Sequence, residues 1–167
     1  MIDRSPNRAR VAVGSLVLAA STLVGIALHE GYTDNAVIPV PGDVPTYGHG
    51  TTRHADGTPV KMGEKTNATR ALVDLLRDAS KFEQAVKRCA PVPMHPYEFQ
   101  AYVSFTYNVG ESAFCNSTLV KKLKTFDYEG ACKELLKWDK VKGVTIKGLT
   151  VRREAEYRTC AGQGEGA

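Results

Sequence analysis

The chain has 167 residues, of which 43% are hydrophobic and 24% are charged. This length suits one domain with an additional segment, and the composition excludes a disordered or low-complexity protein. The formal net charge of +4 suits an anionic polymer but is too small to indicate a nucleic-acid-binding protein. We therefore expect no nucleic-acid partner.

The first element is an apolar run at residues 11–28, VAVGSLVLAASTLVGIAL, which contains no charged residue. Its eighteen residues reach the lower limit for a membrane-spanning helix. Nine of them are Gly, Ala, Ser or Thr, so insertion into lipid should be favourable but weak. Arg4, Arg8 and Arg10 precede the run and predict a cytoplasmic N-terminus.

Three interpretations of this run are open: a cleavable signal peptide, a permanent anchor, and a weak anchor that can leave the bilayer. No small-x-small cleavage site closes the run before His29, which counts against the signal peptide. The weak composition favours the third interpretation. We therefore expect a membrane segment at residues 1–28, a folded domain at 29–161 and a disordered tail at 162–167.

All four cysteines, Cys89, Cys115, Cys132 and Cys160, follow the apolar run. An even number in an exported domain predicts two disulfides, whereas a cytosolic protein would keep four free thiols. The spacing forms no CxxC pair, so we expect no metal and no cofactor. Three pairings are possible and the sequence does not choose among them. We favour Cys89–Cys115, which would tie the end of one helix to the segment after the central helix, and Cys132–Cys160, which would join two C-terminal helices.

The next elements are turns and then helices. Residues 36–62 are rich in Pro and Gly, which indicates turns and short strands, with a hairpin-type turn at ADGT, residues 55–58. From Thr66 the apolar spacing predicts an amphipathic helix whose buried face carries Leu72, Leu75, Leu76, Ala79, Phe82 and Val86.

A central buried helix should follow from Pro96 to Gly110, because proline suits the first helical turn and the segment is rich in apolar and aromatic residues. Further helices are predicted at 117–124, 128–138 and 150–160. The expected fold class is α+β: a larger helical lobe joined to a small β-rich or irregular lobe.

Chemistry is suggested by Glu30, Asp43 and Thr46, which lie directly after the apolar run. Glycoside hydrolysis needs one carboxylic acid to protonate the leaving oxygen and a second group to activate or stabilise the attack on the sugar carbon. A threonine hydroxyl can hold the attacking water. By composition alone, however, carboxylates this far apart are more often solvated surface residues.

Five stretches add a resemblance to this reading: HEG at 29–31, PTYGHG at 45–50, FTYNVGESAFCNSTLVKKL at 105–123, GACKELLKW at 130–138 and GLTVRREAEYRTC at 148–160. In this order they resemble the phage-type lysozymes, glycoside hydrolase family 24. The apolar segment before the acid resembles one subgroup, the signal-anchor-release endolysins. The resemblance implies a mainly helical lysozyme-like fold and a muramidase that cuts the β-1,4 bond between N-acetylmuramic acid and N-acetylglucosamine in peptidoglycan.

The family pattern places its general acid at Glu30, which must hold a proton near neutral pH in a partly desolvated site. Its threonine falls at Thr46, with an inverting outcome if water attacks directly. The family's aspartate stands six residues before that threonine, where this chain has Val40, whereas Asp43 stands three before it. The histidine that usually follows the T-x-G-x-G run is Thr51 here.

The resemblance also implies substrate-binding residues at Gly48, His49 and Gly50, and at Tyr107 and Asn108 on the central helix. From the residues alone, His49 equally fits ordinary loop polarity and Tyr107 the core. For Arg152 and Arg153 the residues leave a solvated helix face or salt bridges as alternatives.

The expected function is therefore an endolysin that lyses the host cell. A monomer would be held inactive at the host inner membrane by residues 11–28, with its N-terminus in the cytoplasm, and then released to the periplasm to act on peptidoglycan. The alternative is a membrane-anchored, non-catalytic module that binds the cell wall. The departure from the family pattern at Val40 favours this alternative.

Overall fold

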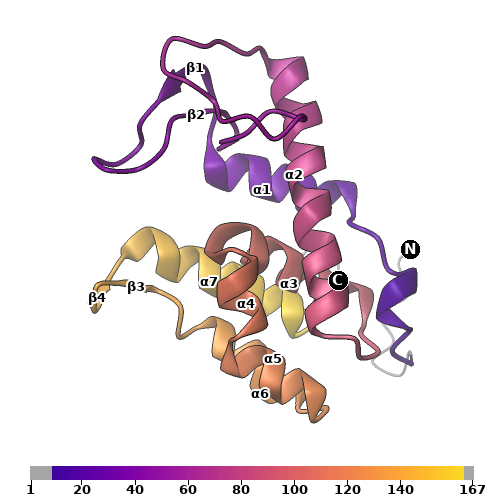
Figure 1. Cartoon of the computed structure of the whole chain (residues 1–167). Helices are drawn as coiled ribbons and strands as arrows, with labels where there is room; N and C mark the ends of the chain where they lie inside the picture. Colours follow the sequence, from indigo (N-terminus) through magenta and orange to yellow (C-terminus); the bar gives the residue numbers. More distant parts are fainter. Residues whose placement is uncertain (1–8, 164–167) are drawn as a thin grey trace. The chain divides into compact units, whose positions relative to one another are not determined.

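The computed structural model describes residues 9–163 of the chain (Figure 1). In chain order the elements are η1 (Val13–Ser15), α1 (Ala20–Glu30), β1 (Thr33–Val37), β2 (Thr46–Gly48), α2 (Ala68–Cys89), α3 (Pro96–Val109), α4 (Glu111–Cys115), α5 (Thr118–Lys124), α6 (Tyr128–Leu135), β3 (Lys140–Val141), β4 (Val144–Thr145) and α7 (Lys147–Cys160). Among the described residues, both sheets have two strands. The predicted α+β class with a larger helical part is confirmed.

The helices begin where the sequence supplies caps for their free backbone N–H groups. Asn67 accepts a hydrogen bond from the Arg70 N–H at 2.9 Å and starts α2. The Ser117 hydroxyl accepts from the Val120 N–H at 3.2 Å and starts α5, and Asp127 accepts from the Gly130 N–H at 2.9 Å and starts α6. Pro96 opens α3 as predicted.

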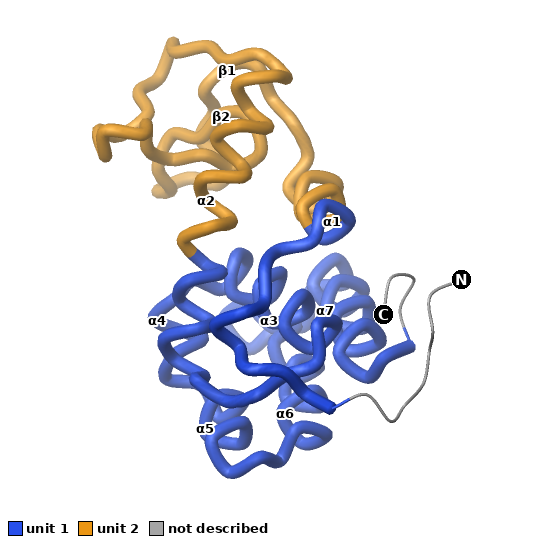
Figure 2. The backbone as a smooth tube through the Cα atoms, turned by 90° about the vertical axis from the view of Figure 1, so that its right-hand side faces the viewer, with its two compact units in different colours: residues 1–22, 82–167 blue, residues 23–81 orange. Residues whose placement is uncertain are grey.

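Two compact units make up the chain, coloured separately in Figure 2. Unit 1 combines the residues up to 22 with those from 82 onward, and unit 2 comprises residues 23–81. In unit 2, β1 and β2 pair antiparallel, with Thr33 opposite Gly48, Val37 opposite Thr46 and an irregular register between them. The predicted turn at 55–58 is confirmed by the bridge between Arg53 and Pro59.

The core of unit 1 forms around α3, whose Phe99, Tyr102 and Phe105 are fully buried. The helix packs along α7, and α6 contacts both α5 and α7. Both favoured disulfides are present: Cys89–Cys115 with a Cα separation of 5.3 Å, and Cys132–Cys160 with 5.7 Å. Each closes a loop between elements of this core, so the predicted central helix and cysteine pairing are confirmed.

One part of the predicted buried face of α2 is wrong. Leu72 and Leu76 are each 51% exposed, while Ala71, Leu75 and Ala79 are buried. The buried face is therefore centred about one residue earlier than the leucines suggest. A carboxylate, Asp74, also occupies this face because two arginines pair with it.

The N-terminal segment differs most from the expected apolar helix over 11–28. Val11 exchanges two backbone hydrogen bonds with Met94, at 3.0 and 2.9 Å, and helix α1 begins only at Ala20. Val13 and Leu16 are 8% and 7% exposed and join the core of unit 1. Within residues 9–163, no helix combines the length and apolar character needed to cross a membrane. Arg4, Arg8 and residues 164–167 of the predicted tail lie outside the described part of the chain.

Candidate active site

Glu30 is the last residue of α1 in unit 2. The fully buried Ile26 anchors this helix one turn earlier. Gly31 ends it with a φ of 71° and donates its N–H to the Ala27 carbonyl at 3.1 Å. Only glycine adopts this left-handed conformation without strain. The HEG motif thus fixes a half-buried carboxyl group at the end of a short helix.

The T-x-G-x-G run forms a tight turn beside Glu30. Tyr47 and Thr51 exchange backbone hydrogen bonds of 3.2 and 3.0 Å. Between them, Gly50 has a φ of 85°, and a Cβ built on it would lie 3.5 Å from Oε2 of Glu30. A side chain at Gly50 would therefore be strained by the backbone conformation, and its Cβ would lie in van der Waals contact with the carboxylate. Gly48, with a φ of 61°, packs so closely on Ala71 that a Cβ would come within 2.9 Å of the alanine Cβ.

His49 joins this turn to the end of α1. Its Nδ1 lies 2.5 Å from the Gly31 carbonyl oxygen, so Nδ1 carries the proton and donates it. Its ring lies 5.6 Å from the ring of Tyr32. The structure therefore shows His49 holding two parts of the candidate site together, and its contact with substrate stays a prediction.

Thr46 begins β2 and is half-buried. Within residues 9–163, its hydroxyl makes no hydrogen bond to another group. Asp43 is exposed in the loop before it, where its Oδ1 accepts the Val44 N–H at 2.9 Å and its own N–H binds the Val40 carbonyl at 2.9 Å. Its role as a second carboxylate therefore stays a prediction.

The other two predicted site residues belong to α3 in unit 1. The ring of Tyr107 meets the ring of Phe82 edge-on, with centroids 5.2 Å apart. Asn108 is exposed, and its Oδ1 accepts a hydrogen bond from Arg153 at 3.0 Å. Asn108 is thus oriented by a residue of α7, and its contact with substrate stays a prediction.

The sequence motif GLTVRREAEYRTC contributes a buried ionic cluster, so the salt-bridge interpretation of Arg152 and Arg153 is confirmed and the solvated-face alternative is wrong. Arg153 is fully buried, and its Nη2 donates to Glu156 at 3.1 Å. The Nε of Arg153 and Oε2 of Glu156 lie 3.0 Å apart without the alignment of a hydrogen bond. Burial raises the pKa of Glu156, although both neighbouring arginines lower it. Arg–Arg–x–x–Glu on one helical turn is the signal that indicates such a cluster.

The family follows from a comparison with known proteins. A family model described as phage lysozyme matches residues 27–156, more than half of the chain. The chain therefore belongs to the phage lysozyme family and is a glycoside hydrolase. This sets aside the alternative of a non-catalytic wall-binding module.

Within the family, the chain is similar to SAR-endolysins. It is 33% identical to the SAR-endolysin of Pseudomonas phage phiKMV over 145 residues, which cover 84% of this chain and 86% of that protein. It is 38% identical to the SAR-endolysin of Escherichia phage Mu over 101 residues, 60% of this chain and 58% of that one. The solved endolysin from Escherichia coli O157:H7 phage FAHEc1 has a TM-score of 0.78 and 38% identity, and the match covers 88% of this chain and 94% of that one.

Proposed function

We propose that Glu30 is the general acid and Thr46 the water-holding residue in the hydrolysis of the β-1,4 bond between N-acetylmuramic acid and N-acetylglucosamine. The observation that carries this assignment is the close approach of Gly50 to Oε2 of Glu30, with 3.5 Å to a Cβ built there. It brings the T-x-G-x-G turn against the carboxyl group. The hydroxyl of Thr46, which has no hydrogen-bond partner among residues 9–163 and lies on the strand that enters this turn, supports the second role.

In this mechanism Glu30 gives its proton to the leaving glycosidic oxygen. A water bound to the Thr46 hydroxyl attacks the anomeric carbon from the opposite face of the sugar and releases its proton to the surrounding solvent as the glycosidic bond breaks. The configuration at that carbon is therefore inverted. Asp43 orients the water or stabilises the positive charge that develops on the sugar ring.

Zymography on purified cell walls tests both roles. Glu30→Gln removes a proton donation that contributes about 10²–10⁴-fold, and it keeps the shape of the side chain. Thr46→Val keeps the shape of threonine and removes its hydroxyl. Both variants should fold as the parent does by circular dichroism and should fail to clear the walls. A Glu30→Gln enzyme that lyses walls at more than a tenth of the parent rate refutes the assignment of the acid.

The second part of the proposal is that residues 11–28 first hold the protein in the host inner membrane and then leave it. The docked conformation of residues 10–19 supports this. Arg10 donates to both oxygens of Glu98, at 2.7 and 3.0 Å, and its guanidinium lies 3.6 Å from the Tyr128 ring centroid. Gln100 donates to the Val17 carbonyl at 2.8 Å and accepts the Ala19 N–H at 2.9 Å.

None of these contacts can form while residues 11–28 span a bilayer, because Arg10 then lies on the far side of the membrane from Glu98. With Arg10 docked, Glu98 is only 3% exposed, and in the tethered protein it lacks this charge partner. Docking of the segment supplies the partner. The folded domain thus favours departure of a weak anchor, and the released monomer acts in the periplasm.

A leucine-rich anchor tests the release. In the docked conformation nothing lies within 4 Å of a Cβ built on Gly14 or Gly25, and Ser15 and Ser21 are exposed. Leucine at these four positions should therefore leave the folded domain intact. Each leucine adds several CH₂ groups, at about 0.8 kcal/mol per group buried in lipid.

The leucine variant should stay in the membrane fraction and fail to lyse cells when the membrane is depolarised. After extraction into detergent it should clear purified walls as the parent does, which shows that its active site is intact. The parent should move to the periplasmic fraction at full length. A shortened soluble form that lacks the first 25 or so residues would instead indicate a cleaved signal peptide.

A further inference from the structure

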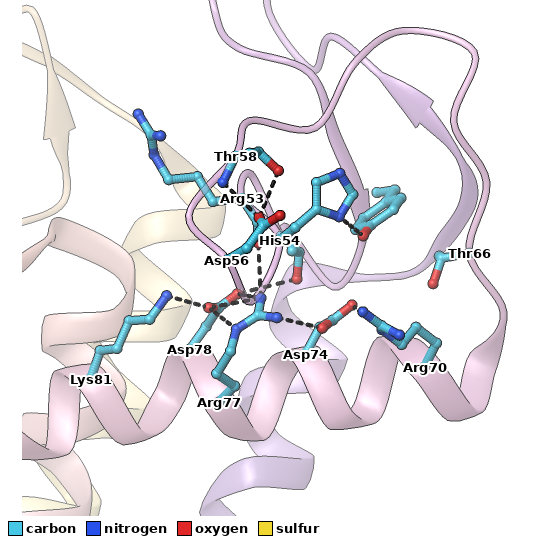
Figure 3. Close-up of polar contacts among 12 residues, drawn as sticks. Arg53, His54, Asp56, Thr58, Thr66, Arg70, Asp74, Arg77, Asp78 and Lys81 are labelled. Atoms are coloured by element: carbon cyan, nitrogen blue, oxygen red, sulfur yellow. Dashed lines mark hydrogen bonds and ion pairs between the residues drawn. The ribbon is translucent and has the colours of Figure 1, made fainter.

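One face of α2 in unit 2 carries an ionic cluster that the sequence motifs did not reveal. Ala71, Asp74 and Asp78 recur at intervals of three and four residues and therefore share that face. Arg77 lies between the two carboxylates in Figure 3: its Nη1 donates to Asp74 at 2.6 Å and its Nε to Asp78 at 3.2 Å. Asp74 is 1% exposed, so its charge is held by its partners rather than by water.

This cluster contacts the turn that follows Thr46. The Thr51 hydroxyl donates to Oδ2 of Asp78 at 3.2 Å, and Thr51 is 1% exposed. The Nη2 of Arg77 donates to the Arg53 carbonyl at 2.9 Å. Two hydrogen bonds thus connect the end of loop 46–53 to α2. One comes from a side chain of the loop, and the other is accepted by a backbone carbonyl of the loop.

The same face of α2 also fixes the position of the N-terminal part of loop 46–53. Gly48 lies against Ala71, where even a Cβ would come within 2.9 Å of the alanine Cβ. Between these two contacts the chain turns tightly, with reciprocal backbone hydrogen bonds between Tyr47 and Thr51. A loop fixed at both ends on α2 has little freedom to move Gly50 away from Glu30.

We propose that Asp78 and Arg77 are positioning residues of the reaction, which hold loop 46–53 so that Gly50 keeps its place beside Glu30 and Thr46 keeps its place at the start of this loop. This inference rests on the assignment of Glu30 and Thr46 made above. The charges around the loop contact are balanced by neighbours on α2, since Lys81 pairs with Asp78 at 2.9 Å and Arg70 with Asp74 at 3.3 Å. Neither positioning residue contacts the sugar. They act through Thr51 and the Arg53 carbonyl.

The position of Thr51 makes this arrangement testable. A threonine hydroxyl does not titrate near neutral pH, so the hydrogen bond to Asp78 stays in place across the range in which a histidine would change its charge.

The test is Thr51→Val, which keeps the shape and removes the donor to Asp78. We expect kcat on solubilised wall glycan to fall about tenfold or more, because a small misplacement of a reacting group is costly, while KM stays within about twofold. Thr51→Ser keeps the hydroxyl and should restore kcat. Thr58→Val is the matched control: it removes a hydroxyl bond to Asp56 of 2.7 Å in the neighbouring turn at 55–58, outside residues 46–53, and should leave kcat unchanged.

Combination with Thr46→Val separates positioning from general loss of structure. If Thr51 acts through Thr46, adding Thr51→Val to Thr46→Val should lower kcat little further. Loss of activity in Thr46→Val with unchanged kcat in Thr51→Val overturns this inference alone. Full activity in Thr46→Val overturns the assignment of Thr46 and this inference with it.

A lower melting temperature with unchanged kcat in Thr51→Val would show a purely structural role and refute positioning. If Thr51→Val does not fold, Asp78→Asn replaces it, because the amide lacks the charge that pairs with Arg77 beside the Arg53 carbonyl. The same tenfold loss of kcat is expected there, and an unchanged kcat overturns the inference. Lys81→Gln removes only the outer partner of Asp78 and serves as its control.

Discussion

The ion pair between Arg10 and Glu98 connects the docked N-terminal segment to α3. It is bidentate, with distances of 2.7 and 3.0 Å, and Glu98 also accepts the backbone N–H of His95 at 2.8 Å. The Arg10 side chain is 33% exposed, whereas that of Glu98 is 3% exposed. Arg10→Met removes the guanidinium but keeps an apolar stem, and it leaves a buried carboxylate with one hydrogen-bond donor.

Loss of one partner of a fully buried ion pair costs about 3–5 kcal/mol. Here the cost is smaller, because water reaches the Arg10 side and the His95 N–H remains bound to Glu98. We expect Arg10→Met to lower the free energy of unfolding by about 2–3 kcal/mol. For a chain of this length the melting temperature should fall by about 5–10 °C.

Urea unfolding of the released, soluble protein measures this loss. Arg88→Met is the control, since Arg88 pairs with Glu111 while both side chains are at least half exposed, and it should cost at most about 1 kcal/mol. Adding Glu98→Gln to Arg10→Met removes the stranded charge and should restore part of the stability. A loss below about 0.5 kcal/mol in Arg10→Met, or no recovery in the double variant, would refute the reasoning.

Three further predictions concern the catalytic loop, the disulfides and pH. Asp43→Ala should lose much more wall-lytic activity than Asp34→Ala, and equal small losses would exclude Asp43 from the mechanism. Replacing both cysteines of the Cys132–Cys160 bridge, which spans 28 residues, by Ala should lower the free energy of unfolding by about 3 kcal/mol in urea titrations. Burial lowers the pKa of His95, so the folded state binds fewer protons there than the unfolded state. Stability should therefore fall as pH drops below about 6.5, by up to about 1.4 kcal/mol per pH unit, and a pH titration of unfolding on His95→Asn should show a shallower fall.

The local elements could be predicted from the sequence because their signals lie within a few residues. Pro96 and the aromatic content that follows it predicted α3, and the Asp–Gly pair at 56–57 predicted the hairpin turn. The helices over 117–124 and 128–138 were found within a few residues at their ends. The proposed role of Glu30 as general acid rests on motif resemblance, and Gly50, which the structure places beside it, belongs to the T-x-G-x-G part of the same family pattern.

The remaining features depend on partners far away in the chain. The apolar run at 11–28 fits a membrane helix by its composition, yet in the folded protein its first part pairs with Met94 and Gln100, which supply hydrogen bonds and a buried surface. The exposure of Leu72 likewise follows from which face of α2 meets its neighbours, and apolar spacing alone does not specify this.

The polar clusters were the least predictable, because a charged residue is buried only where a distant group compensates its charge. Arg10 and Glu98 are 88 positions apart, and the hydroxyl of Thr51 meets Asp78 across 27 positions. Composition suggests solvent exposure for each of these residues when it is considered alone. Only the folded chain brings each charge to its partner, and that pairing stabilises it in the interior.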